Sequence, residues 1–433
     1  MQSSLQHPTS FSSKRTPKPN PKYALVAKVV GWTNVCTDLT LTEACAIEAY
    51  PDVQPVTGDA HSWEPAPKTV RDILKMTDGV VRQEWLKSLK KEIKTLIEAG
   101  TFVHDNLKEG EVSTPVMETF KVKVKSDGLL DKLKARLVVR DDLQDKNITE
   151  DKWSPTASFR SLKMFLGHAC RIKARVKQFD FVGAFLQAKM RSRMFVTIPK
   201  IYGILFPEYA EYCGIPVRLA MSMYGTTLCG KYWYLDLTEY LLKIGFRASE
   251  CMRCLFIRTY PDDGIHLYVL NYVDDMLYYC KDSTKTKEFE EKLRARFHLE
   301  LMGQAHWYLG TRINQLSNYD IELDQSRYCL SIIKKYLETA GAAKNDRPHV
   351  TPFALDFVPT ADDCSSDENA ALQLQKEYNI DFASCIGSLI YLGMTRCDIV
   401  YAVNKLAKFT RQPGRNHFNA LLHLLRYLRD NAL

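Results

Sequence analysis

The chain has 433 residues, of which 45% are hydrophobic and 25% charged, with a net charge of +8. This is the composition of a globular protein, and no apolar run approaches the roughly 18 residues of a membrane span. The twelve cysteines follow no repeating frame and no signal sequence begins the chain. We therefore expect an intracellular, cytoplasmic protein that contacts no membrane. The mild basic excess permits a polyanionic partner without proving one.

Composition and patterning along the chain predict five segments. Ser, Pro and Lys-rich patches near the N-terminus favour weak order, and acidic, polar residues favour a second linker. The segments are a tail over 1–68, a mixed helix-and-strand region over 69–325, a helix over 326–344, a linker over 345–377 and a helical segment over 378–433.

The first elements after the tail are a helix and two strands. Residues 70–99 carry apolar side chains on one helical face, and Gly100 ends the helix. Residues 119–124 and 135–140 alternate basic with apolar side chains, which predicts strands with one wet, positive face.

A further amphipathic helix over 159–174 leads directly into a strand over 176–182, where Asp180 is a lone acid among apolar neighbours. A helix follows over 231–244 and ends at Gly245. The pattern then predicts a hairpin over 266–280, a charged helix over 285–297, a strand pair over 307–313 and 321–323, a helix over 326–340, and two or three helices with a basic surface over 386–433.

The predicted hairpin over 266–280 carries two adjacent carboxylates, Asp274 and Asp275, at its tip. Its aromatic and β-branched residues favour buried strands, where an uncompensated carboxylate costs several kcal/mol. A divalent cation with oxygen ligands, such as magnesium, would remove this cost. The alternative is a surface turn that simply accepts Asp, although tight turns normally use Asn-Gly or Asp-Gly and Met276 follows here.

Cys251 and Cys254 have the spacing of a zinc half-site. A zinc site needs a second pair at a suitable distance, and Cys229 and Cys280 do not supply one. We therefore interpret these cysteines as structural.

Asp180 precedes the acid pair by about 90 residues. If the two strands lie side by side in one sheet, three carboxylates converge at one point. Such a cluster can hold two magnesium ions roughly 4 Å apart, which activate a hydroxyl and stabilise a phosphoryl transition state.

With these motifs, the chain from about residue 81 onward resembles the reverse transcriptase of copia-type long-terminal-repeat retrotransposons. The matching blocks, in order, are Lys134-Ala-Arg-Leu-Val-Val-Arg140, Phe179-Asp-Phe-Val-Gly-Ala-Phe-Leu186, Met223-Tyr-Gly225 with Tyr232-Trp-Tyr234, Tyr272-Val-Asp-Asp275, and Leu389-Ile-Tyr-Leu392 with Thr395-Arg396, Asp398-Ile399 and Tyr401-Ala-Val-Asn404. Five blocks in the right order are hard to obtain by chance.

This resemblance implies an α+β fold, a right-hand polymerase with fingers, a ferredoxin-like palm and a thumb, followed by a helical C-terminal segment. Fingers and palm would occupy 69–325, the thumb-like helix 326–344, and a thumb or connection segment 378–433.

The resemblance also implies roles for the acids. Asp180 and Asp274 would bridge two Mg²⁺ ions, for which Mn²⁺ could substitute, with Asp275 nearby in a less essential role. Phe185 occupies the family's steric-gate position, where a ring under the sugar would exclude a 2′-hydroxyl. The alternative for Phe185 is an ordinary core aromatic.

Nucleotide and primer contacts follow from the same resemblance. Lys134, Arg136 and Lys231 would bind the incoming nucleotide, since cations neutralise phosphate charge; a solvated strand face is the alternative for the first two. The primer and template residues would be Tyr272, Trp307 and Gly310, the last two in a primer grip whose alternative is a packed hairpin.

The sequence departs from the family pattern in its third block. The family usually has Leu-Lys-Gln-Ala-Pro-Arg after Tyr-Gly, and its glutamine helps to hold the nucleotide. Here residues 226–231 read Thr-Thr-Leu-Cys-Gly-Lys, with Leu228 at the glutamine position. Val182-Gly183 and Gln187-Ala188 also depart from the pattern. These changes indicate either a lineage variant or the start of decay.

No protease triplet, integrase-like His/Cys cluster or Cys-rich knuckle is found, and the chain ends where the family's RNase H domain would begin. We expect a segment of a longer polyprotein or a truncated copy, with integrase and RNase H products as partners besides template, primer and deoxynucleotides.

Three hypotheses follow, led by an RNA-directed DNA polymerase. The second is a decayed fragment that only binds nucleic acid. The third, a nucleotide cyclase, shares acids on a ferredoxin-like sheet but has no support in the flanking blocks.

Overall fold

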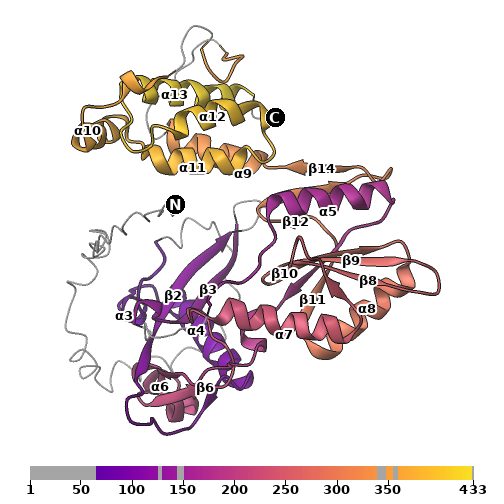
Figure 1. The fold of residues 1–433 in the computed structure, drawn as a ribbon. Helices are drawn as coiled ribbons and strands as arrows, with labels where there is room; N and C mark the ends of the chain where they lie inside the picture. The colour runs from indigo at the N-terminus through magenta and orange to yellow at the C-terminus, as the bar shows by residue number, and fades with distance from the viewer. Residues whose placement is uncertain (1–64, 125–128, 144–150, 339–347, 355–358, 432–433) are drawn as a thin grey trace, which may run out of the picture. The chain divides into compact units, whose positions relative to one another are not determined.

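The computed structural model describes residues 65–124, 129–143, 151–338, 348–354 and 359–431 (Figure 1). Nearly all of the predicted tail over 1–68 lies outside these ranges. The described residues form two compact units, and residues 194–218 join the first unit although they follow part of the second in the chain. Residues 69–325 therefore contribute to both units.

The first unit is a five-stranded sheet with helices. Its strand order is β1-β6-β5-β2-β3, and β2 pairs with β5 in parallel. The elements are α3 (Val70–Leu74), α4 (Gly79–Glu98), β1 (Phe102–Val103), β2 (Ser113–Val124), β3 (Leu130–Val139), β5 (Phe195–Thr197), α6 (Ile201–Leu205) and β6 (Pro216–Leu219).

The helix predicted over 70–99 is wrong in one respect, because the chain forms two helices there. The Asp78 carboxylate accepts hydrogen bonds from the backbone N–H groups of Val80 and Val81 at 2.8 and 3.2 Å. This side chain satisfies N–H groups at the start of α4, so a new helix begins at Gly79. As predicted, the helix ends just before Gly100, whose φ is 66°.

The second unit is built on a six-stranded sheet with the strand order β11-β4-β10-β9-β8-β7. Its elements are α5 (Phe159–Arg171), β4 (Lys177–Phe181), a 3-10 helix (Ala184–Gln187), α7 (Cys229–Lys243), β7 (Arg247–Ala248), β8 (Leu255–Thr259), β9 (His266–Tyr272), β10 (Asp275–Cys280), α8 (Ser283–Arg296) and β11 (Leu299–Gln304). The predicted hairpin and the helices on either side of it are confirmed.

Both faces of this sheet are covered, which explains the nearly continuous apolar run of β9 and β10. Alternate residues such as Met276 and Tyr278 share a core with α7 and α8. The residues between them, including Leu277 and Tyr279, share a second core with α5 and the next small sheet.

That small sheet consists of β12 (Trp307–Tyr308), β13 (Thr311–Gln315) and β14 (Ile321–Asp324). The prediction of one strand over 307–313 is wrong, because Leu309 and Gly310 turn the chain with φ values of 48° and 65°. Positive φ at both central residues is the signature of a type I′ turn, so this stretch is itself a hairpin.

The C-terminal helices of the second unit share one hydrophobic core, with members from Cys329 to Leu428. They are α9 (Ser326–Ile332), a π-helix (Ile333–Glu338), α10 (Glu368–Tyr378), α11 (Phe382–Leu392), α12 (Val400–Ala407) and α13 (Arg415–Asp430). Residues 339–344 of the predicted thumb-like helix lie outside the described ranges.

The prediction of a linker over 345–377 is wrong for its last part, where α10 forms. The Asp367 carboxylate accepts a hydrogen bond from the Ala370 N–H at 2.8 Å and starts this helix. Within the described ranges, no helix is both long and apolar enough to cross a membrane.

Candidate active site

The acid-bearing turn joins β9 to β10, and its two central residues are Val273 and Asp274. The prediction that Asp275 lies in the turn is wrong. Asp275 is the first residue of β10 and pairs with Tyr272. Val273 has a φ of 55°, while Asp274 is not among the residues with positive φ. This is the pattern of a type II′ turn, whose first central residue is normally glycine. A β-branched residue there is strained.

Two hydrogen bonds hold this strained turn. The Trp233 indole Nε1–H of α7 donates to the Val273 carbonyl at 2.6 Å. The Phe181 N–H at the end of β4 donates to the Asp274 carbonyl at 2.8 Å. Because Trp233 is almost fully buried, α7 fixes the turn from the core.

Asp180 lies beside the acid turn. β4 and β10 are antiparallel neighbours in the centre of the sheet, and Asp180 is the direct register partner of Asp275. Side chains so paired share a face, with Cβ atoms roughly 4.5–5.5 Å apart. The sheet thus brings together the three acids that the sequence singled out.

The acids disfavour one another's charge. Burial, together with the nearby Asp274 and Asp180 carboxylates, raises the pKa of Asp275 to about 6, against a hydrogen bond from Gln178 that lowers it. At pH 7 the fold therefore holds an ionised group at a cost in stability. A bound cation would remove that cost.

The donor set fits a divalent metal ion with a preference for oxygen ligands, such as Mg²⁺ or Mn²⁺. In the described part of the chain, no three His, Cys, Asp or Glu side chains already converge closely enough to enclose an ion. The strand pairing fixes the backbones of Asp180 and Asp275.

Two polar residues beside the acids, Gln178 and Glu300, were not predicted from the sequence. Glu300 of β11 is the register partner of Asp180 on its other side, so Asp275, Asp180 and Glu300 form a row across three strands. Gln178 lies two residues before Asp180 on the same face. Only that period-two spacing in the sequence could have pointed to Gln178.

The β12–β13 hairpin, with the predicted primer and template residues Trp307 and Gly310, lies on this face. Its Tyr308 ring packs edge-on against Tyr272, with centroids 6.4 Å apart. Trp307 is 44% exposed, and its carbonyl accepts a hydrogen bond from Gln178 at 2.9 Å.

The turn of this hairpin is held by α11. The Tyr391 hydroxyl donates a hydrogen bond to the Leu309 carbonyl. A Cβ atom added at Gly310 would lie 2.7 Å from the Tyr391 hydroxyl oxygen. Gly310 is therefore required both by its positive φ and by the close approach of α11.

Phe185 and Lys231 belong to the same unit as the acids. Phe185 follows β4 in the 3-10 helix, is half-buried, and packs edge-on against Tyr224 with centroids 5.5 Å apart. Lys231, in the first turn of α7, donates from Nζ to the Asp151 carbonyl at 2.6 Å. Leu228 is 2% exposed and packed in the core, so it offers nothing to a nucleotide.

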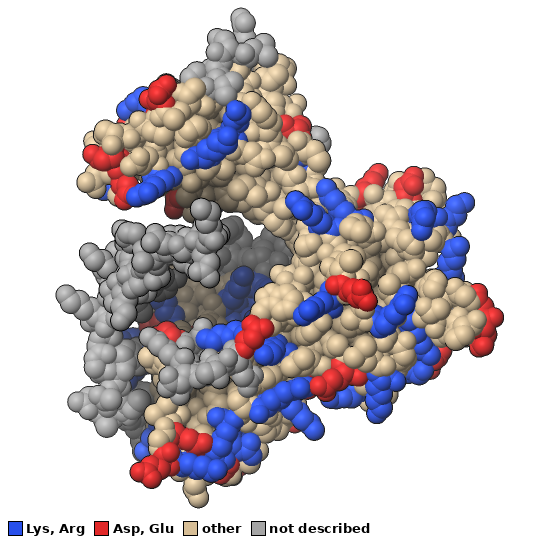
Figure 2. All heavy atoms as spheres, viewed as in Figure 1, with Lys and Arg blue, Asp and Glu red and all other residues tan. Residues whose placement is uncertain are grey.

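Lys134 and Arg136 belong to the first unit, on β3. Lys121 and Lys123 of β2 are register partners of Lys134 and Lys132, so these cations share one face of the β2–β3 ribbon with Arg136. Burial and the neighbouring Arg136 and lysines lower the pKa of Lys134. On the face drawn in Figure 2, basic and acidic side chains are interspersed.

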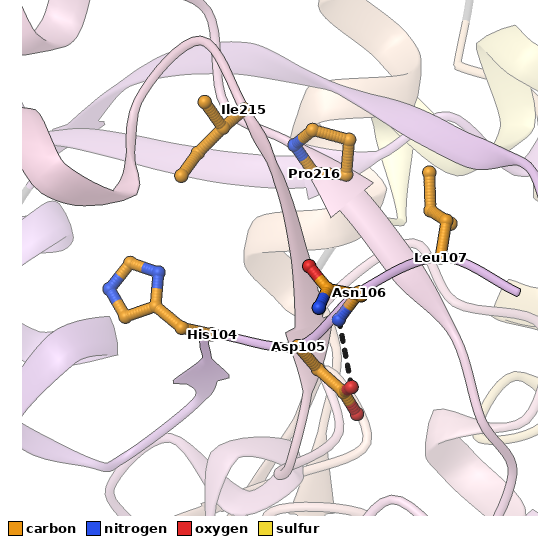
Figure 3. Close-up of a pocket in the computed structure, with 6 residues that line it drawn as sticks. All are labelled: His104, Asp105, Asn106, Leu107, Ile215 and Pro216. Atoms are coloured by element: carbon orange, nitrogen blue, oxygen red, sulfur yellow. Dashed lines mark hydrogen bonds between the residues drawn. The ribbon is translucent and has the colours of Figure 1, made fainter.

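A separate depression of about 510 Å³ lies in the first unit and contains none of the predicted site residues (Figure 3). It is lined by His104, Asp105, Asn106, Leu107, Ile215 and Pro216. Its carboxylate, Asp105, pairs with the Arg218 guanidinium at 2.8 Å.

Comparison with known proteins now defines the class. A family model described as "Reverse transcriptase (RNA-dependent DNA polymerase)" matches residues 103–351, which is more than half of the chain. The chain therefore belongs to the reverse transcriptase family.

Two relatives are retrovirus-related Pol polyproteins of copia-type transposons, as the resemblance predicted. The chain is 25% identical over 369 residues to that of transposon TNT 1-94 from Nicotiana tabacum, covering 84% of this chain and 26% of the relative. It is 30% identical over 310 residues to that of transposon RE2 from Arabidopsis thaliana, covering 71% and 20%. The chain thus spans about a quarter or less of these relatives.

A solved structure of apo telomerase from Candida tropicalis, truncated from its C-terminal domain, aligns with a TM-score of 0.30 and 9% identity. The alignment covers 56% of this chain and 60% of that one. A likeness this low carries no argument about the fold.

Proposed function

We propose that this chain is an RNA-directed DNA polymerase that adds deoxynucleotides to a primer 3′-hydroxyl and releases pyrophosphate. The observation that carries the proposal is the direct pairing of Asp180 with Asp275, beside Asp274, in a chain of the reverse transcriptase family. In this proposal the first unit serves as fingers, the six-stranded sheet as palm, and the C-terminal helices as thumb and connection.

Asp180, Asp274 and Asp275 hold two Mg²⁺ ions in this proposal. When bound, such ions lower the pKa of an attacking hydroxyl and stabilise charge on the transferred phosphoryl group. The fit is supported by the burial of Asp275 and by the nearby charges of Asp274 and Asp180, which together raise the pKa of Asp275. The sheet supplies the alignment, since two of the acids sit on adjacent, hydrogen-bonded strands.

The surrounding residues position the substrates. Phe185 excludes a 2′-hydroxyl from the sugar site, and Lys134, Arg136 and Lys231 bind the triphosphate. Lys231 would have to leave the Asp151 carbonyl to do so. Tyr272, Trp307 and Gly310 hold the primer end and template. Template, primer and deoxynucleotides are the partners, with integrase and RNase H as further products of the same polyprotein.

Primer extension on poly(rA)/oligo(dT) with Mg²⁺ tests this proposal. We expect dTTP incorporation by the wild-type protein and none by Asp274→Asn. The matched control is Asp262→Asn, an exposed aspartate in the turn that precedes β9, which should keep full activity. A folded, soluble wild-type protein that incorporates no dTTP would refute the proposal.

The second candidate is nucleic-acid binding without polymerisation. Two observations favour it: the side chain at the family's glutamine position, Leu228, is buried, and the Lys231 ammonium is bonded to the Asp151 carbonyl. Salt-dependent binding of a primer–template duplex without incorporation would support this candidate, and template-directed extension would exclude it.

A further inference from the structure

Gln178 is a buried polar residue next to the acids that no family motif above includes. It lies in β4 two residues before Asp180, so both side chains project from the same face. Since Asp180 pairs with Asp275, Gln178 is the diagonal neighbour of Asp275 across the two strands. Its side chain is within reach of Asp275, and the residue is only 7% exposed.

The Gln178 amide makes two hydrogen bonds to distant parts of the chain. Its Nε2 group donates to Asp275 Oδ1 at 3.1 Å. The same nitrogen donates to the Trp307 carbonyl of β12 at 2.9 Å. A primary amide nitrogen carries two N–H groups, so both donors are used, one for each partner.

We infer that Gln178 is a positioning residue that orients the Asp275 carboxylate and attaches the β12–β13 hairpin to the acid-bearing strands. The inference rests on the proposed polymerase function and deepens it. A shift of the hairpin at Trp307 moves the same amide that orients Asp275, so the geometries of hairpin and carboxylate are coupled.

The chemistry of an amide suits this role. Lys or Arg at this position would also donate to a carboxylate, but its positive charge would compete with a metal ion for Asp275. A neutral donor fixes one carboxylate oxygen without that competition. Hydrogen-bond partners that orient metal ligands typically contribute about 10- to 100-fold to metal affinity or activity.

Gln315 provides a matched control. It is also 7% exposed and lies in the same unit, on β13. Its side chain also makes two hydrogen bonds, accepting from the Val176 N–H at 3.0 Å and donating to the Ala174 carbonyl at 2.8 Å. Neither partner is an acid. Gln315→Met therefore removes a comparable buried amide without touching Asp275.

The test compares Gln178→Met with Gln315→Met in the full chain, using Mn²⁺ as the probe. We expect Mn²⁺ affinity, measured by electron paramagnetic resonance titration, to fall by about 10-fold or more in Gln178→Met and to stay near wild type in Gln315→Met. In primer extension, kcat should fall and the Mg²⁺ concentration for half-maximal rate should rise for Gln178→Met alone, with KM for dTTP unchanged. Thermal unfolding should show similar losses of stability in both variants.

Gln178→Asn serves as a second variant should Gln178→Met not fold, because it keeps an amide and withdraws it by one methylene. Equal Mn²⁺ affinities in the Gln178 and Gln315 variants would overturn the inference, as would a wild-type chain that binds no Mn²⁺. A wild-type chain that binds Mn²⁺ but extends no primer would count against the proposed function only, since the comparison of affinities would still decide the role of Gln178.

Discussion

The six-stranded sheet and the C-terminal helices of the second unit hold their carboxylates under opposite conditions. In the sheet, Asp275 lies against Asp180 and Asp274, and burial together with these charges raises its pKa to about 6. In the helices, the Arg429 side chain and the His349 backbone N–H each donate to the Asp430 carboxylate at 2.8 Å. The hydrogen bond from Arg429 leads the effects that lower the Asp430 pKa to about 2.

Asp398 repeats the helical arrangement. Arg396 donates to both of its oxygens, at 3.0 and 2.8 Å, and the Tyr427 hydroxyl donates at 2.8 Å. These partners lower the Asp398 pKa. Asp398 and Asp430 therefore stabilise the folded chain, whereas the charge of Asp275 opposes folding at neutral pH.

Among the changes that test this contrast between sheet and helices, Asp275→Asn should have the largest effect. If Asp275 holds a metal ion as proposed, its removal should lower dTTP incorporation by at least about 100-fold, which corresponds to a few kcal/mol of lost transition-state stabilisation. The same change should raise the free energy of unfolding by about 1–2 kcal/mol at pH 7 in EDTA, because a charge disfavoured by burial is gone. Primer extension and urea denaturation measure the two effects.

The difference in the free energy of unfolding between wild type and Asp275→Asn should depend on pH. The folded pKa of Asp275, about 6, is above its ordinary value of 3.8. This group therefore favours folding below pH 3.8, and that contribution is lost as the pH rises to about 6. The advantage of Asp275→Asn should appear over this window, and an equal difference at pH 3.5 and pH 7 would contradict it.

Mg²⁺ should stabilise the wild-type chain through the acid turn. At ten times its dissociation constant, a ligand that binds only the folded state adds roughly 1.4 kcal/mol. Thermal unfolding with and without Mg²⁺ should show this gain in wild type and a smaller one in Asp275→Asn. Asp398→Asn is the matched control and should gain as much stability from Mg²⁺ as the wild type. Loss of this gain in Asp398→Asn would contradict the difference between sheet and helices.

Asp430→Asn should change the free energy of unfolding in the opposite direction to Asp275→Asn. It should lower the free energy of unfolding by about 1 kcal/mol at pH 7, a value reduced for solvent screening of a surface pair. The lowered pKa of Asp430 means that its contribution is present above pH 3.8 and lost as the pH falls toward 2. Denaturation series of the two proteins should therefore converge between pH 4 and pH 2, and curves that stay parallel would argue against this assignment.

The smallest effect should come from Val273→Asn, which separates backbone strain from charge at the acid turn. Asn accepts a positive φ more readily than a β-branched residue, so the free energy of unfolding should rise by about 0.5 kcal/mol. The change leaves all three carboxylates in place. A loss of stability would mean that packing of the Val273 side chain outweighs the strain of its backbone.

Much of the second unit could be predicted from the sequence, because its signals are local. The run from His266 to Cys280 is rich in aromatic and β-branched residues, and Asp180 stands alone in an apolar strand. Such patterns predict buried strands. An ionised carboxylate in a buried strand is costly unless a positive charge, such as a bound cation, compensates it. The pairing of Asp180 with Asp275 further requires that the two strands be neighbours in this register, which the structure shows.

The features that could not be predicted from the sequence depend on contacts between distant residues or on one helix-capping side chain. The Gln178 amide bonds to Trp307, 129 residues away, and nothing in the local pattern specifies that partner. Residues 194–218 join the first unit through the pairing of β5 with β2, which is equally non-local. The helix α10 was not predicted because its polar composition is typical of a linker. The capping side chain of Asp367 was the one local signal for its start.

The shared core of the C-terminal helices sets a limit on how the protein can be shortened in the laboratory. Cys329 and Ile332 of α9 pack with Leu389 of α11 and Leu421 of α13. A chain that ends after the acid-bearing sheet, anywhere before residue 382, would lack the apolar partners of α9. It would also lack the hydrogen bond from the Tyr391 hydroxyl to the Leu309 carbonyl. A shortened chain intended for crystallisation or screening should therefore extend through Asp430.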